Sequence, residues 1–253
     1  MNTRPRQQIL TLIAIALTFG SGVADVTSFT RLGEVFASVM TGNIVLWGLA
    51  AARGSLTLFS HTAVAIAGYI AGVAAGTWVA HGAKKAGAGR DENRVGVLEA
   101  HVVWVLLAEL TLVAGFTVGW EVSGASPAGW AQFCLLATLA AAMGIQSLAV
   151  TQMGLTEVST TYLTGTLTGL VSSLASPGQD THHGLRRFGV LIGLVAGASL
   201  CGLFVATAAD GVPALLLAAL VTALVLAVGP DWRQPRLLLR PRAPVRPAAG
   251  PRR

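Results

Sequence analysis

Four carboxylic acids stand inside long apolar stretches of this chain: Asp25, Glu34, Glu109 and Glu157. No lysine or arginine accompanies them within those stretches. A charged side chain at the centre of a membrane costs about 2.5–3.5 kcal/mol on insertion scales. Each acid must therefore be protonated, hydrated or bound to a cation, and together they form a candidate proton or cation relay. The alternative for Glu34 and Glu157 is a helix N-cap, where a carboxylate suits the helix dipole.

A Thr-Gly pair occurs twice, each time in a similar apolar context. Residues 32–43 align with residues 155–166, and the identical columns are Leu32/Leu155, Glu34/Glu157, Val35/Val158, Thr41/Thr164 and Gly42/Gly165. The stretch Gly-Tyr-Ile-Ala-Gly at 68–72 is matched by Gly-Leu-Val-Ala-Gly at 193–197, which extends the similarity. Such small-residue ladders are surfaces for close helix packing. The chain is therefore predicted to consist of two copies of one unit, residues 9–121 and residues 122–229.

The polar residues of both copies indicate a possible solute pathway. Glycine permits unusual backbone dihedrals, and threonine and asparagine side chains can satisfy backbone groups that a broken helix frees. Asp25 would take up a proton or cation, and neutral side chains would hydrogen-bond the solute. The predicted substrate-binding residues are Asp25, Thr41, Gly42 and Asn43, faced by Gln146, Thr164 and Gly165.

Composition places the chain in a membrane. Hydrophobic residues make up 53% of it, charged residues only 11%, and the mean hydropathy is +0.67. A soluble domain has roughly 25% charged residues. The net charge of +6 does not indicate a nucleic-acid partner, because many arginines lie in the proline-rich segment 230–253. That segment is predicted to be a disordered tail. Neither cysteine belongs to a metal-binding motif, and no metal or cofactor is expected.

Eight apolar segments decide the expected topology. They lie near residues 9–29, 34–52, 57–80, 98–120, 129–150, 156–175, 188–208 and 211–229. If all eight cross the membrane, the four basic residues of loop 81–97 lie outside the cell. If segments 34–52 and 156–175 enter and return on one side, only Arg31 and Arg53 lie outside. The positive-inside rule favours this second arrangement, although a continuous, polar-faced helix is the alternative.

The second arrangement predicts an all-α, polytopic transmembrane bundle of six full spans. Both termini, including residues 1–8, then lie in the cytoplasm. The first spans of the two units then run in opposite directions, so the two repeats are inverted. Each repeat holds one partial or broken segment. Inverted repeats with interrupted helices recur in transporters and channels, where irregular backbone lines a cavity at the membrane midplane.

The residues Gly22-Val23-Ala24-Asp25, Leu32-Gly33, Phe36 and Thr41-Gly42-Asn43 resemble the signature of the YoaK family. This is a family of small prokaryotic membrane proteins of unknown function, and the similarity covers most of residues 9–229. Val26 stands where the family usually has alanine. The second unit has Thr166 where asparagine would complete the motif, and Leu148 aligns with Asp25. The resemblance implies a membrane location, and it implies no substrate.

The sequence thus predicts a multi-pass protein of the plasma membrane that transports or conducts a small solute, with a proton or cation involved. Its expected partners are the lipid bilayer and an unidentified solute, and a homo-oligomer is an open alternative. One alternative is a non-transporting assembly or sensor protein whose repeat is architectural. An intramembrane enzyme acting on lipid is a third class. The chain has no recognisable catalytic motif, and it is not expected to be an enzyme.

Overall fold

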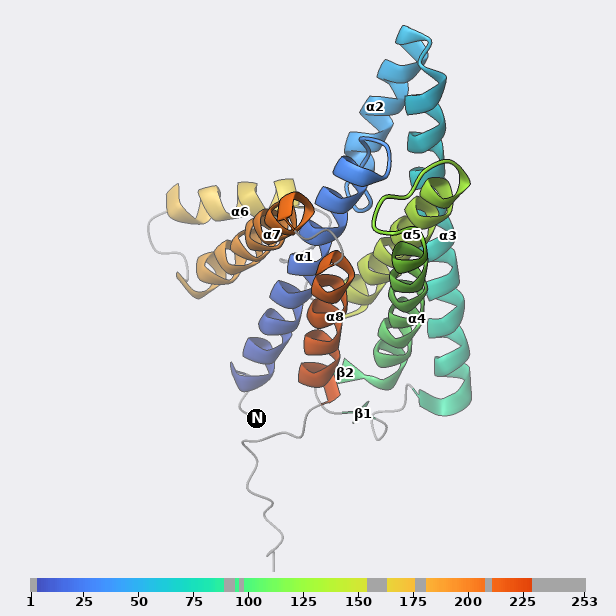
Figure 1. The fold of residues 1–253 in the computed structure, drawn as a ribbon. Helices are drawn as coiled ribbons and strands as arrows, with labels where there is room; N and C mark the ends of the chain where they lie inside the picture. The colour runs from blue at the N-terminus through green and yellow to red at the C-terminus, as the bar shows by residue number, and fades with distance from the viewer. Residues whose placement is uncertain are drawn as a thin grey trace, which may run out of the picture.

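The fold was analysed in a computed structural model, which describes residues 4–88, 94–95, 98–153, 163–175, 181–207 and 211–228. Within these residues the chain forms a helical bundle (Figure 1). The helices are α1 (Arg4–Arg31), α2 (Met40–Arg53), α3 (Leu56–Ala83), α4 (Ala100–Val122), α5 (Trp130–Gln152), α6 (Leu163–Ala175), α7 (Thr181–Thr207) and α8 (Val212–Val228). A π-helical turn at Lys84–Ala88 follows α3, and a small hairpin pairs β1 (Arg94–Val95) with β2 (Leu98–Glu99). The predicted all-helical bundle is confirmed.

Helix length separates the elements that can cross a bilayer from those that cannot. Five described helices, α1, α3, α4, α5 and α7, are long and apolar enough to cross it. α8 is also apolar, and its 17 residues lie at the lower limit for a span. α2 has 14 residues and α6 has 13. At 1.5 Å per residue each reaches only about 20 Å, less than the roughly 30 Å hydrocarbon core.

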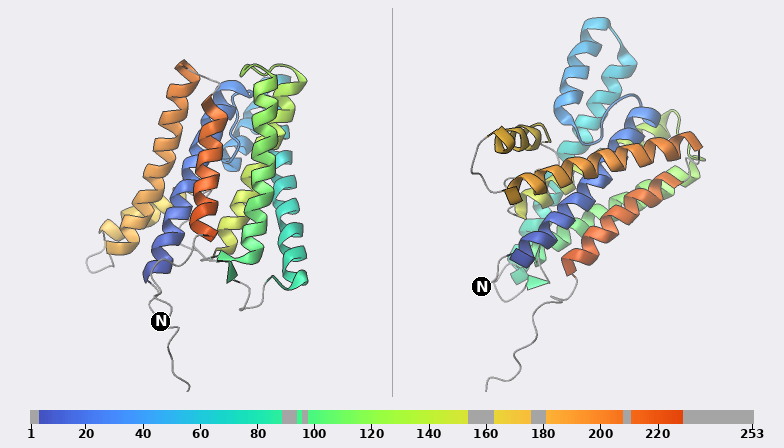
Figure 2. Two further views of the ribbon diagram at one scale, coloured as in Figure 1. Left: turned by 60° about the horizontal axis from the view of Figure 1, so that its bottom comes forward. Right: turned by 90° about the vertical axis from the view of Figure 1, so that its left-hand side faces the viewer.

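The long helices stand side by side, and the two short helices lie at the edges of the bundle. α2 and the start of α3 form a helical hairpin that projects beyond the other helices, whereas α6 lies against α7 on another side (Figures 1 and 2). The beginning of α1 and the end of α8 lie at the same end of the bundle (Figure 1). α1 and α5 run in opposite directions along it.

Glycines bring α1 very close to α7. Gly22 lies against the backbone of α7, and a methyl group added there would sit 2.9 Å from the Ala198 nitrogen and still nearer the Leu194 carbonyl oxygen. Gly193 of α7 approaches α1 in the same manner, 3.0 Å from the Ile15 carbonyl oxygen. Any side chain at these positions would force the two helices apart. The glycines therefore set the distance between α1 and α7.

A second glycine interface joins α5 to α3. A methyl group at Gly144 would lie 3.0 Å from the Val73 nitrogen and nearer still to the Tyr69 carbonyl oxygen. One at Gly68 would lie 2.7 Å from the Ala137 carbonyl oxygen. The predicted role of the Gly68 and Gly193 ladders in helix packing therefore agrees with their positions.

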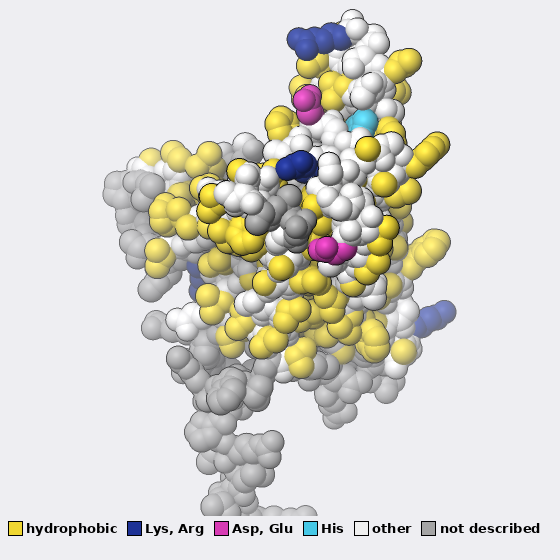
Figure 3. Space-filling model, in the orientation of Figure 1, with side chains coloured by type: hydrophobic (Ala, Val, Ile, Leu, Met, Phe, Trp, Pro, Cys, Tyr) yellow, Lys and Arg dark blue, Asp and Glu magenta, His cyan; other side chains and the backbone are white. Residues whose placement is uncertain are grey.

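Two helix starts differ from the sequence expectation. The apolar segment 34–52 is helical only from Met40, because residues 32–39 form an irregular connection. The helix in the segment near 188–208 begins earlier than expected, at Thr181. Its first turns are polar, so the apolar segment does not include them. Apolar side chains cover much of the face shown in Figure 3, and few charged groups interrupt them. That surface suits a lipid environment.

Candidate functional site

Asp25 anchors the connection between α1 and α2. Its Oδ1 atom accepts a hydrogen bond from the Ser38 backbone nitrogen at 2.7 Å, and its Oδ2 atom accepts one from the Ser38 hydroxyl at 2.6 Å. Asp25 precedes the last residue of α1, Arg31, by nearly two turns, or about 9 Å along the axis. The connection must therefore turn back beside α1 to reach it. α2 starts at that depth and leads away again.

Asn43 holds the same connection from the other side. The Phe36 nitrogen donates to Asn43 Oδ1 at 2.9 Å, and Asn43 Nδ2 donates to the Phe36 carbonyl oxygen at 2.6 Å. The buried amide thus pairs with one backbone residue as a neighbouring strand would. Gly42 leaves room for the Phe36 ring, which a methyl group there would meet at 3.3 Å. The ring also stacks on Phe29 with centroids 5.4 Å apart.

We call Asp25, Ser38, Phe36 and Asn43 the loop clamp. Asp25 is only 8% exposed, and both of its oxygens are engaged by Ser38. Its carboxylate also lies near the first turn of α2, where the helix dipole favours negative charge. The motif residues that suggested a solute pathway in the first unit therefore converge on the backbone of residues 36–39.

The remaining Thr-Gly residues lie elsewhere. Thr41 is exposed on α2, and Thr164 and Gly165 are exposed on α6. α2 packs on α3 whereas α6 packs on α7, on separate sides of the bundle (Figures 1 and 2). The structure does not bring these pairs together. Glu157 lies outside the described residues.

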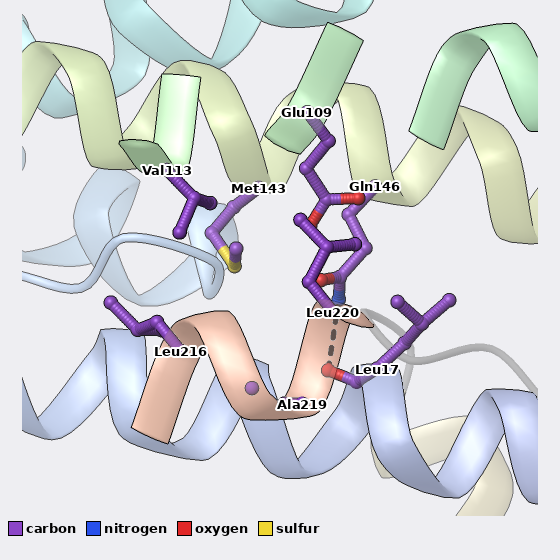
Figure 4. A pocket seen from close by; sticks show the side chains of 9 residues that line it. Leu17, Glu109, Val113, Met143, Gln146, Leu216, Ala219 and Leu220 are labelled. Carbon is purple, nitrogen blue, oxygen red and sulfur yellow. Dashed lines mark hydrogen bonds between the residues drawn. The ribbon is translucent and has the colours of Figure 1, made fainter. Parts of the chain in front are cut away.

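Glu109 occupies a different environment, in the middle of the bundle. It is 1% exposed, and within the described part of the chain its Oε2 atom has no hydrogen-bond partner. It borders a cavity of about 10 Å³ between α1, α4, α5 and α8 (Figure 4). The other lining residues are Leu17, Gly20, Val113, Met143, Gln146, Leu216, Ala219 and Leu220. This volume is close to the minimum that one water molecule needs.

Gln146 supplies the polar wall of this cavity. Its Nε2 atom donates to the Leu17 carbonyl oxygen at 3.1 Å and to the Ser21 hydroxyl at 2.8 Å. Gln146 therefore joins α5 to α1 beside Glu109. We call Glu109, Gln146 and Ser21 the central polar cluster. A neutral carboxyl with one water is far less costly there than a bare carboxylate, since the lining provides no counter-ion.

Glu34 lies at the end of the bundle, two residues before Phe36 of the loop clamp. It is exposed, and its backbone has φ of 60°. α2 has Val39 as its N-cap, so the N-cap alternative for Glu34 is wrong. It borders a larger polar cavity that also contains His61 and Gln132. Sequence reasoning missed both residues, although each is a polar residue in an apolar segment.

The described residues contain no group of three His, Cys, Asp or Glu side chains that could hold a metal ion. The two cysteines are free, and Cys201 is buried against Thr27 of α1, with their sulfur and hydroxyl oxygen 3.3 Å apart.

Comparison with known proteins agrees with the membrane architecture. The sequence profile of a family described as "Protein of unknown function (DUF1275)" matches residues 13–228. The chain is 29% identical over 170 residues to the UPF0700 transmembrane protein YoaK of Bacillus subtilis (strain 168), covering 67% of this chain and 68% of that protein. No solved structure matches the chain.

Proposed function

The chain belongs to the DUF1275 family of integral membrane proteins, and on that premise we propose that it transports or conducts a small solute through two inverted repeats. The proposed location is the plasma membrane, with both termini in the cytoplasm. Glu109 would carry a proton or cation at the centre. Gln146, beside it, would hydrogen-bond the solute.

The observation that carries the proposal is the match between the two glycine interfaces. A shift of about 122 positions takes Ile15 and Gly22 of α1 to Ala137 and Gly144 of α5. Moving 125 positions back along the chain aligns Leu194 and Gly193 of α7 with Tyr69 and Gly68 of α3. Under both shifts, the contact of Gly22 with Leu194 corresponds to that of Gly144 with Tyr69.

The same correspondence holds for the reciprocal glycines. The contact of Gly68 with Ala137 becomes that of Gly193 with Ile15, and Gly72 with Ala141 becomes Gly197 with Phe19. Because α1 and α5 run in opposite directions, the operation that relates the halves would be a rotation about an axis in the membrane plane. In this alignment Ser147 replaces Leu148 as the residue equivalent to Asp25. The site would then be asymmetric.

The loop clamp supports a re-entrant first unit. Residues 32–39 turn back to Asp25, and α2 returns toward the end of the bundle from which they came. This path fits a segment that enters and leaves on one side. Impermeant thiol reagents test it in a Cys134→Ser background. In intact cells Ser126→Cys should react and Lys85→Cys should not, and labelling of Lys85→Cys would contradict the proposed orientation.

A closed midplane favours a second candidate function, a non-transporting assembly or sensor protein. The cavity beside Glu109 has a volume of about 10 Å³, close to the minimum that one water needs. A transporter in an occluded state would have the same geometry. Charge movement separates the two functions.

Proteoliposomes containing the full chain can be examined on a solid-supported membrane during jumps in pH or in solute concentration. A transporter should give currents that Glu109→Gln abolishes, and Glu121→Gln, at an exposed acid, should leave them intact. Absence of current across a panel of small cations, carboxylates and amines would instead support the non-transporting function.

A further inference from the structure

A polar cavity of about 420 Å³ opens where α1 ends and where α3 and α5 begin. We call it the terminal vestibule. Its lining residues are Phe29, Thr30, Arg31, Gly33, Glu34, Ser55, Thr57, Leu58, His61 and Gln132. The volume is within the range of small-molecule sites and far larger than the central cavity. A small organic ligand can therefore fit there without a change in helix packing.

Glu34 provides the unpaired charge of the vestibule. Its side chain is exposed, and within the described residues its carboxylate makes no hydrogen bond or ion pair. Its φ of 60° is a conformation that glycine or asparagine adopts more readily. The backbone thus gives no reason for glutamate at this position. Glu34 therefore contributes its carboxylate to the vestibule rather than a favourable backbone conformation.

The neighbouring basic group does not neutralise Glu34. Arg31 directs its guanidinium to α7, where Nη2 donates to the Val205 carbonyl oxygen at 3.1 Å. α1 also ends at the vestibule, and the C-terminal end of a helix carries partial negative charge. The first turn of α3 is already capped, because the Ser55 hydroxyl accepts a hydrogen bond from the Leu58 nitrogen. α5 also begins there, with Gly129 as its N-cap and no side-chain cap, so the helix ends do not set the sign of the ligand's charge. Glu34 is the charged group of the vestibule whose side chain makes no contact within the described residues.

The polar floor of the vestibule is rigid. His61 Nδ1 lies 2.7 Å from the Thr57 carbonyl oxygen, and Nε2 lies 3.2 Å from Gln132 Oε1. Gln132 is itself oriented, because its Nε2 atom donates to the Arg31 carbonyl oxygen at 3.0 Å. His61 is buried, and both of its ring nitrogens face oxygen atoms of the protein. These contacts shape the site, and Glu34 provides its charge.

Phe29 adds an aromatic surface to the same cavity. Its side chain is 45% exposed, and stacking on Phe36 fixes the ring. An aromatic face attracts cations within about 6 Å, and quaternary ammonium groups are bound in this way. We infer that the terminal vestibule binds a small organic cation whose ammonium group lies between the Glu34 carboxylate and the Phe29 ring. This inference rests on the proposed function, because it names the class of solute that would enter there.

Calorimetric titration of the purified full-length protein with choline tests the inference. Its neutral isostere 3,3-dimethylbutan-1-ol, which has the same shape without the charge, is the matched ligand control. Choline should bind and the alcohol should not. Glu34→Gln should weaken choline binding at least tenfold, Phe29→Leu should weaken it less, and Glu121→Gln should leave it unchanged. Glu34→Gly removes the carboxylate with a residue that suits the local backbone. It should keep the fold and lose choline binding, which separates loss of the charge from loss of the fold.

Equal binding of choline by the wild type and Glu34→Gln would overturn the inference. So would equal binding of the alcohol, or no binding of choline to the wild type. The outcome is independent of the transport assay. Choline binding without any current would refute transport and leave the site standing. A current that is unchanged in Glu34→Gln, together with absent choline binding, would refute the choline site and leave transport standing.

Discussion

Asp25 and Glu109 are both buried acids inside apolar helices, yet their surroundings are opposite. Both oxygens of Asp25 accept hydrogen bonds from Ser38, whereas the Oε2 atom of Glu109 has no partner among the described residues. Asp25 thus fixes an irregular connection at a defined depth. Glu109 borders a space large enough for one water. An acid with satisfied oxygens stabilises a conformation, and an acid with an unsatisfied oxygen is available for proton or cation binding.

The largest expected effect comes from Asp25→Ala. The change leaves the nitrogen and hydroxyl of Ser38 buried without their acceptor, and hydrogen bonds to a charged group contribute about 1.5–3 kcal/mol each. Unfolding in mixed detergent micelles should show a loss of about 3 kcal/mol. Asp25→Asn should show an intermediate loss, since the amide keeps one acceptor.

Ser38→Ala, which removes only the hydroxyl, should cost less than Asp25→Ala. If Asp25→Ala were as stable as the wild type and had lost only its transport current, Asp25 would belong with Glu109 as a functional acid. The contrast between the two sites would then be broken.

Asn43→Ala tests the other half of the loop clamp, with a smaller expected effect. It removes both hydrogen bonds to the Phe36 backbone, and the predicted loss of unfolding free energy is about 2 kcal/mol. Asn43→Asp is the charged comparison, because its second carboxylate oxygen would face the Phe36 carbonyl oxygen, acceptor against acceptor, in a buried site. Its loss should exceed that of Asn43→Ala. Equal stability of all three proteins would show that the clamp does not hold the connection.

Glu109→Met should change stability least. Methionine matches the length of the side chain and removes a buried oxygen without a partner, so stability should stay equal or rise by about 1 kcal/mol. The same variant should lose the pH-driven current if Glu109 carries the proton. A loss of stability as large as that of Asp25→Ala would mean that Glu109 has a structural partner, and it would remove the difference between the two acids.

Hydropathy predicted eight apolar segments, and each of the eight described helices overlaps one of them. It placed the start of α2 too early, since Leu32, Val35 and Ala37 are buried in an irregular connection. A buried loop and a buried helix have the same composition. What distinguishes them is the satisfaction of backbone groups by Asp25 and Asn43, which hydropathy does not measure.

The acids themselves were predictable, whereas their roles were not. Asp25 is paired with a serine 13 positions away, a contact that exists only because the chain turns back. The surroundings of Glu109 come from four separate helices. His61 and Gln132 were missed because their importance depends on α3 and α5 meeting at the end of α1. Sequence spacing alone contains none of these distances.

The glycine contact between Gly22 and Leu194 has a consequence for how the protein is made. The two residues are separated by about 170 positions, so at 5–20 residues per second the partner of Gly22 emerges roughly 10–30 s later. Throughout that time α1 sits in the membrane without the helix against which it finally packs. The glycine face of α1 that later contacts α7 is therefore uncovered until α7 is made. An interruption of synthesis before α7 would leave that face of α1 without its partner helix.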